Sequence, residues 1–179
     1  EARAGDALFL TKPLGTGLVL AGAARGVVGE AEASEATGRM TELNDRSAEA
    51  LRGFEPSAVT DVTGFGLFGH AHEMAERSGV RVALDAESMP ALPGALEAAA
   101  EGVRTGGDAR NRDFAAKALE LNGVPDELVA LGFDPQTAGG LLVSVAADKA
   151  AVLSARFQED GLFLARVGRV EEGSGVAVS

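Results

Sequence analysis

The stretch from Ala58 to Met74 constrains the fold of this 179-residue chain more than any other part of the sequence. Ala58 to Val62 predicts a short apolar strand that carries one carboxylate, Asp61, near its end. Closely spaced glycines then predict a turn, and an amphipathic helix follows from Gly64 to Ser78, where Gly79 ends it. A fold that contains this unit needs a sheet and at least one layer of helices packed on it.

The glycines of this unit suit either a ligand site or a packing device. Glycine lets the backbone approach a ligand, and a helix start presents unpaired N–H groups to anions, so Asp61 beside such a site indicates a bridging cation. Alternatively, Gly64, Gly66 and Gly69 allow tight packing of the strand against the helix. Asp61 is then an ordinary cap or turn residue. The pattern alone leaves both interpretations open.

Strand and helix signals alternate along the chain without a linker, a low-complexity tract or an internal repeat. Strands are predicted over residues 7–10, 58–62, 80–85, 141–145 and 165–170, with a further edge strand over 176–178. Helices are predicted over residues 18–24, 34–54, 64–78, 95–101, 113–122, 125–131 and 147–159. Because the strands are short and the helices vary in length, the sequence predicts a single α+β domain over 1–179. Its mixed sheet is expected to be covered by helices mainly on one face.

The composition restricts the classes of partner. The chain has no cysteine, so disulfides, thiolate metal sites and thiol nucleophiles are excluded within it. A formal net charge of -11 argues against nucleic acid and anionic membrane surfaces, both of which repel an acidic protein. No apolar run reaches transmembrane length, and the first residues lack a signal design, so a soluble, cytoplasmic protein is expected.

The turn over residues 11–17 is a second candidate for contact with phosphate. Gly15 and Gly17 flank Thr16, and exposed backbone N–H groups there, with Lys12 alongside, suit an anion. However, the spacing of a P-loop is absent, and a lysine in a glycine-rich turn is most often solvated, so both interpretations stay open.

The two histidines do not predict a metal site. His70 and His72 are two positions apart and lie on different faces of the predicted helix, so they do not form a metal-binding i,i+4 pair. Packing or hydrogen bonding at the helix start is expected for them. Elsewhere, two arginines that flank Asn111 either hold an anion or cap the helix that follows.

Three stretches, taken together and in order, resemble the selenophosphate synthetase (selenide, water dikinase) family. They are Thr11-Lys12-Pro13-Leu14-Gly15-Thr16-Gly17, then Asp61-Val62-Thr63-Gly64-Phe65-Gly66-Leu67 with Gly69-His70, then Asp134-Pro135-Gln136-Thr137 with Gly139-Gly140. The pairs Gly106-Gly107 and Arg110-Asn111, and the residues Met40, Leu43 and Asn44, also match. Ala138 departs from the family, which usually has serine there, so no hydroxyl role is carried over to that position.

The resemblance covers essentially all of this chain but only the C-terminal half of the enzyme. It implies the ferredoxin-like C-terminal domain of the aminoimidazole ribonucleotide synthetase-like superfamily. It also implies that the cysteine or selenocysteine, a catalytic lysine and most magnesium-binding aspartates belong to an N-terminal half. No catalytic residue is therefore expected in this chain.

By resemblance, the full-length protein is a homodimeric kinase that converts ATP, selenide and water to selenophosphate, AMP and phosphate. Asp61 matches the aspartate that this domain contributes to the Mg²⁺ cluster on the ATP phosphates. Because Thr63 and Gly64 lie close to Asp61 in the sequence, they are expected to shape the approach of the phosphates. Lys12 and Thr16 are expected to lie nearby. The segment over residues 134–140 is expected to have a packing role.

Two other functions remain as alternatives. One is a different ATP-using member of the superfamily, such as aminoimidazole ribonucleotide synthetase or a hydrogenase maturation protein. The sequences of 134–137 and 64–67 favour selenophosphate synthetase over both. The other is a non-catalytic domain that binds a partner protein through its acidic surface.

Overall fold

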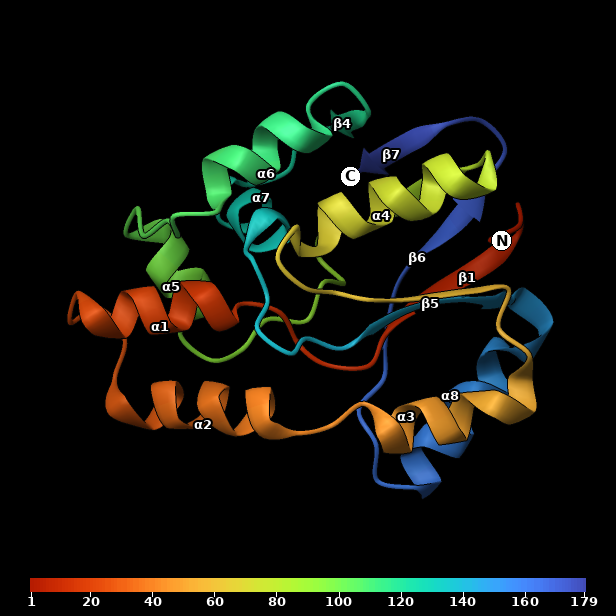
Figure 1. The fold of residues 1–179 in the computed structure, drawn as a ribbon, viewed down its shortest axis with the longest axis horizontal. Helices are drawn as coiled ribbons and strands as arrows, with labels where there is room; N and C mark the ends of the chain where they lie inside the picture. The colour runs from red at the N-terminus through yellow and green to blue at the C-terminus, as the bar shows by residue number, and fades with distance from the viewer.

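The computed structural model describes residues 1–179 as one mixed sheet with helices on both faces (Figure 1). The strands are β1 Asp6–Leu10, β2 Ala58–Asp61, β3 Arg81–Leu84, β4 Leu119–Leu121, β5 Leu141–Ala146, β6 Ala165–Glu171 and β7 Gly175–Val178. The helices are α1 Thr16–Ala24, α2 Glu30–Thr41, α3 Asp45–Leu51, α4 Gly66–Ser78, α5 Ala95–Ala100, α6 Asp108–Ala115, α7 Asp126–Phe133 and α8 Ala150–Glu159. Two short 3-10 turns, Arg52–Phe54 and Ala147–Lys149, follow α3 and precede α8.

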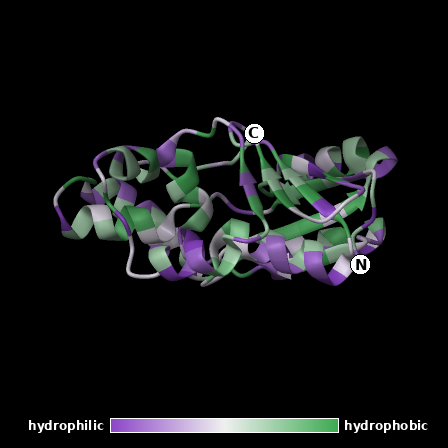
Figure 2. Ribbon diagram, turned by 90° about the horizontal axis from the view of Figure 1, so that it is seen from above, coloured by the Kyte–Doolittle hydropathy of each residue, from purple (hydrophilic) through white to green (hydrophobic).

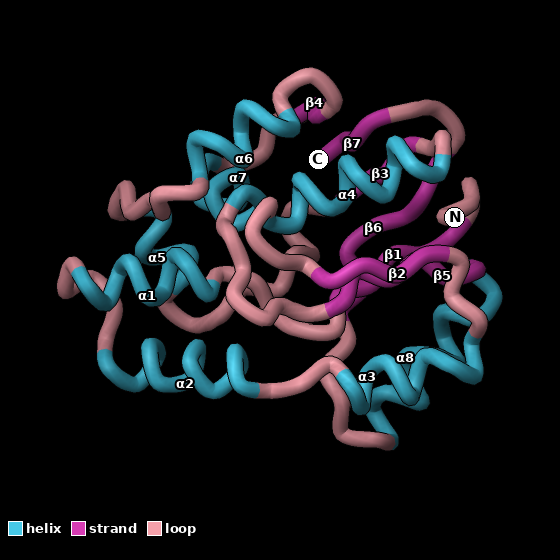
Figure 3. The backbone as a smooth tube through the Cα atoms, in the orientation of Figure 1, coloured by secondary structure: helices cyan, strands magenta, loops and turns pink.

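The strand order in the seven-stranded sheet is β2-β5-β1-β6-β3-β7-β4 (Figure 3). The pairs from β2 through β3 are antiparallel, whereas β7 runs parallel to both β3 and β4. The predicted α+β class with a mixed sheet is confirmed. The strand β2 lies at one edge, so Asp61 at its end is held by a single neighbouring strand, opposite Leu141 of β5.

The sheet has a large core on one face and a small one on the other. Strand β1 shows the division, because Leu8 and Leu10 belong to a cluster of 34 buried residues while Ala7 and Phe9 belong to a second cluster of 8. Helices α1, α4, α5 and α7 contribute to the large cluster, and α3 and α8 contribute to the small one (Figure 1). Most helical cover therefore lies on one face, as predicted. Seen from above, the strands are largely apolar (Figure 2).

The long helix predicted over 34–54 is wrong, because the structure divides this region. Helix α2 ends at Thr41, and α3 begins at Asp45. Between them, Lys12 Nζ donates to the carbonyl oxygens of Glu42 at 2.6 Å and Arg39 at 3.5 Å, and α2 does not continue past this point. Carbonyls at a helix end lack intrahelical partners, and a buried lysine satisfies them here.

The helix predicted over 113–122 is also wrong. Helix α6 occupies Asp108–Ala115, and the residues after it form β4, which pairs in parallel with β7. The sequence from Ala115 to Leu121 favours a helix locally, but the open side of β7 offers backbone hydrogen bonds that decide its conformation. The strand over 176–178 is confirmed, although it is internal and β4 forms the edge.

Gly66 fixes how closely α4 approaches α7. Its φ is +70°, and a Cβ built there would lie 2.8 Å from the carbonyl oxygen of Gly132 and 2.9 Å from the backbone of Phe133. A side chain at Gly66 therefore meets both a strained conformation and fixed backbone atoms.

We expect Gly66→Ala to lower the free energy of unfolding of this chain by about 2 to 4 kcal/mol, through strain and overpacking. Gly64→Ala is the matched control, because a Cβ at Gly64 meets no atom within 4 Å. It should change stability by less than about 0.5 kcal/mol. Urea unfolding of both variants measures the difference, and equal stabilities would contradict the assigned role of Gly66.

Candidate functional site

The segment Asp134–Gly140, called here the central turn, is where the three sequence motifs meet. Its backbone hydrogen bonds reach the Asp61 turn, since Gln136 N donates to Thr63 O at 3.0 Å and Val62 N donates to Gly140 O at 2.8 Å. A Cβ added at Gly139 would collide with Val62 O, so only glycine permits this approach. The predicted packing role of residues 134–140 agrees with these contacts.

Two buried side chains of the central turn hold the start of α1. Gln136 Oε1 accepts from Gly15 N at 3.0 Å and from Thr16 N and Thr16 Oγ1 at 3.3 Å. Asp134 Oδ2 accepts from Gly17 N at 2.9 Å. These N–H groups have no partner within the helix, so the acceptors satisfy donors that burial would otherwise leave unpaired.

The central turn also connects to Lys12 and Thr16. Lys12 Nζ donates to Ala138 O at 2.9 Å, and Thr137 N donates to Thr16 Oγ1 at 3.1 Å. Lys12 is only 6% exposed, and burial lowers the pKa of its ammonium, against the raising effect of Glu42. Lys12 and Thr16 thus have structural contacts here, and their contact with phosphate stays a prediction.

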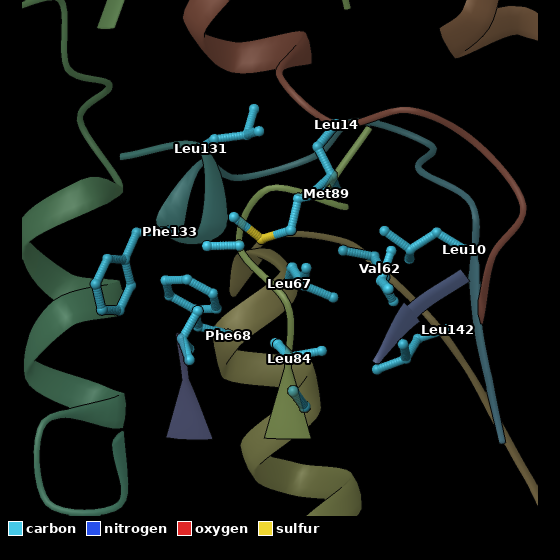
Figure 4. Packing of buried hydrophobic residues seen from close by; sticks show 14 of the residues in the cluster. Leu10, Leu14, Val62, Leu67, Phe68, Leu84, Met89, Leu131, Phe133 and Leu142 are labelled. Carbon is cyan, nitrogen blue, oxygen red and sulfur yellow. The ribbon is translucent and has the colours of Figure 1, made fainter. Parts of the chain in front are cut away.

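Asp61 presents an open carboxylate at the end of β2. It is exposed and makes no side-chain hydrogen bond or ion pair in the structure. The next residue, Val62, is fully buried and lies among Leu67, Leu10 and Leu142 in the large core (Figure 4). Because Val62 is anchored in this way, the preceding carboxylate is fixed in place at the surface.

The residues after Asp61 are held from two further sides. Asn111 is fully buried, and its Nδ2 donates to Gly64 O at 2.8 Å and Phe133 O at 3.0 Å. Thr63 Oγ1 lies 3.1 Å from His70 Nε2 on α4. Asn111 therefore ties α6 to this turn, and neither the anion nor the capping interpretation had anticipated that contact.

A surface pocket of about 460 Å³ lies between β2 and α4. Asp61 lines it together with His70, Glu73 and Arg77 of α4 and the N-terminal Glu1. His70 forms a hydrogen bond and packs on the Phe65 ring at 5.8 Å, which agrees with its predicted role. The structure thus places Asp61, Thr63 and Gly64 on one turn. Lys12 and Thr16 instead contact Ala138 and Thr137 of the central turn.

Asp61 is a suitable donor for one position of a magnesium ion. Mg²⁺ prefers carboxylate oxygen, keeps several waters and takes its remaining ligands from phosphates, so one free carboxylate can contribute without forming a complete site. No group of three or more His, Cys, Asp or Glu side chains in the structure is arranged to hold a metal ion.

The carboxyl group of Asp134 binds its proton more tightly than an ordinary aspartate does. Burial raises its pKa from 3.8 to about 7, although hydrogen bonds from Leu18, Gln136 and Gly17 lower it. Its Oδ1 is buried without a partner, so ionisation places a charge where only one oxygen is solvated by hydrogen bonds. The folded chain consequently retains this proton at a pH at which the unfolded chain has released it.

The free energy of unfolding should therefore fall as the pH rises from about 4 to about 7 and then level off, because the folded state binds more protons in that interval. Asp134→Asn keeps the acceptor for Gly17 N and removes the titration. Between pH 4 and pH 8, the free energy of unfolding of the wild type should fall by on the order of 3 kcal/mol more than that of the variant. Urea unfolding across this range measures the difference, and parallel curves for the two proteins would refute it.

Comparison with known families identifies the class of this fold. Residues 3–179 match the model of the AIR synthase related protein, C-terminal domain. The chain belongs to this family. None of its helices combines the length and the apolar composition needed to cross a membrane.

Curated relatives that match this chain are selenide, water dikinases. The chain is 42% identical over 170 residues to selenide, water dikinase 2 of Peptoclostridium acidaminophilum, covering 94% of this chain and 49% of that protein. It is 42% identical over 178 residues to selenide, water dikinase of Caldanaerobacter subterraneus, covering 96% and 50%. The resemblance found in the sequence motifs is thereby confirmed, and the chain spans about half the length of these curated relatives.

Solved structures agree on the fold. Thiamine-monophosphate kinase from Stenotrophomonas maltophilia superposes with a TM-score of 0.73 at 23% identity, covering 99% of this chain and 51% of that one. The hydrogenase maturation protein HypE of E. coli gives a TM-score of 0.67 at 20% identity, covering 98% and 46%. At these identities the similarity establishes the architecture alone.

Proposed function

We propose that this chain is the C-terminal domain of an ATP-dependent selenide, water dikinase, which forms selenophosphate, AMP and phosphate from selenide, ATP and water. The observation that carries the proposal is the 42% identity to selenide, water dikinases over nearly the whole chain. A HypE structure with the same fold, at a TM-score of 0.61, was solved in complex with ATP. The proposal includes the cytoplasm as location and a homodimer as the complete enzyme.

Asp61 would supply one carboxylate ligand to magnesium in an ATP site shared with another domain. Its exposed position at the end of the edge strand supports this role, because the carboxylate is accessible from outside this domain. Magnesium bound there would neutralise charge on the phosphates. Thr63 and Gly64, fixed by His70 and Asn111, would shape the place where the phosphates lie.

The direct test uses the full-length protein with ATP, selenide and magnesium, followed by ³¹P NMR. Formation of selenophosphate with AMP and phosphate is the expected result. Nucleotide binding without selenide-dependent turnover would favour another ATP-using member of the superfamily. Absence of nucleotide binding would favour a non-catalytic interaction domain.

In the full-length enzyme, Asp61→Asn should weaken magnesium-dependent use of ATP while the fold stays intact, because a neutral amide is a poorer magnesium ligand. We expect the magnesium concentration for half-maximal activity to rise about tenfold or more. Asp148→Asn is the matched control, since Asp148 is also exposed but follows the opposite end of β5. Unchanged kinetics for Asp61→Asn across a magnesium titration would exclude the assigned role.

The isolated chain of residues 1–179 should fold but not catalyse, because its contribution to the proposed site is a single carboxylate with the turn that carries it. Circular dichroism and cooperative urea unfolding test the first part. An assay for AMP released from ATP in the presence of selenide tests the second, and turnover by this chain alone would overturn it.

A further inference from the structure

His70 connects helix α4 to the turn that carries Thr63. Its Nε2 lies 3.1 Å from Thr63 Oγ1, and the residue is only 7% exposed. The ring edge faces Phe65 with 5.8 Å between centroids. These contacts hold the ring beside Thr63, a half-buried residue, so His70 positions the Thr63 hydroxyl without Thr63 being enclosed in the core.

The other ring nitrogen faces an acidic partner. His70 Nδ1 lies 3.0 Å from Glu73 Oε2, one helical turn further along α4, although the two are not aligned for a hydrogen bond. The Glu73 side chain is 34% exposed, so rotation of its terminal torsion is free to improve the alignment. Asp61, Arg77 and the N-terminal Glu1 are the other charged residues that line this pocket.

A phosphate ligand determines which groups donate and which accept hydrogen bonds between the ligand, Thr63 and His70. Phosphate oxygens accept hydrogen bonds and do not donate them, so a threonine that contacts phosphate must donate its only hydroxyl proton. The hydroxyl then approaches His70 with a lone pair, and the imidazole must donate from Nε2. Nδ1 already faces a carboxylate, so a ring that donates from both nitrogens satisfies Thr63 Oγ1 and Glu73 together.

We propose that His70 is a positioning residue that donates from Nε2 to Thr63 Oγ1 and so directs the Thr63 hydroxyl proton toward a phosphate oxygen of the bound nucleotide. This inference rests on the proposed function and extends it, because it assigns recognition of the polyphosphate to a pair of residues joined across the turn.

A double-mutant cycle in the full-length protein tests the coupling. The variants are Thr63→Val, His70→Phe and their combination, and the readout is equilibrium binding of a non-hydrolysable ATP analogue with magnesium. Each single change should weaken binding about tenfold, the loss expected for one hydrogen bond to a charged group. The double variant should bind no more weakly than Thr63→Val, and the affinity for adenosine should not change.

Two further variants separate positioning from general damage. His70→Gln retains an amide N–H that can reach Thr63 and should recover most of the affinity. His72→Phe is the control on the same helix, because His72 packs on Phe114 at 5.5 Å and makes no hydrogen bond to Thr63; it should leave binding unchanged. Thermal unfolding of every variant verifies that it is folded.

An independent measurement on the wild type needs no variant. The imidazole ¹⁵N resonances of the nucleotide-bound protein should show His70 Nε2 protonated, and an unprotonated Nε2 would overturn the inference. Additive losses in the cycle would also overturn the inference about His70, and so would equal binding by His70→Phe and His72→Phe. In either case the proposed function still stands if the wild type binds the nucleotide. A wild type that binds no nucleotide would overturn both.

Discussion

The buried carboxamide of Gln136 is the interaction on which the rest of the structure depends. Its oxygen accepts from Gly15 and Thr16 at the start of α1, and its amide nitrogen donates to Asp134 at 2.7 Å. The backbone N–H of the same residue donates to Thr63 O. One residue thus joins a helix, the central turn and the loop after β2. Because these groups are buried, losing any partner leaves a polar atom unsatisfied, at a cost of about 1 to 3 kcal/mol.

The site owes its geometry to contacts that lie behind it. The carboxylate of Asp61 has no side-chain partner, yet Asp61 pairs with Leu141 in the sheet, Val62 is anchored in the core, and Asn111 binds the loop at Gly64. The carboxylate is therefore placed by its chain neighbours, which leaves its oxygens available for a ligand. This arrangement is consistent with a residue whose partners arrive from another domain, since fixing a ligand group in advance reduces the entropy lost on binding.

Periodicity and glycine placement predicted most strands and the α+β class, because those signals depend on local burial. The elements that were predicted wrongly depend on contacts with residues distant in the sequence. Lys12 ends α2 from 27 residues away, and β4 forms because β7 has an open side. At the candidate site, resemblance pointed to Asp61 and the neighbourhood of Asp61 pointed to Thr63, and both assignments stay predictions. The roles of Gln136 and Asn111 were not predicted, because their partners lie in other motifs and a single sequence shows no pairing between segments.

Gly139 has a consequence for any attempt to recombine this domain with its relatives. The close approach of Gly139 to Val62 O, together with the contact of Gly140 with Lys12 N, means that residues 11–17, 58–66 and 134–140 share one tightly packed boundary. A chimera that exchanges only one of these segments pairs surfaces shaped for different neighbours. A chimera that takes all three segments from one parent keeps these contacts matched.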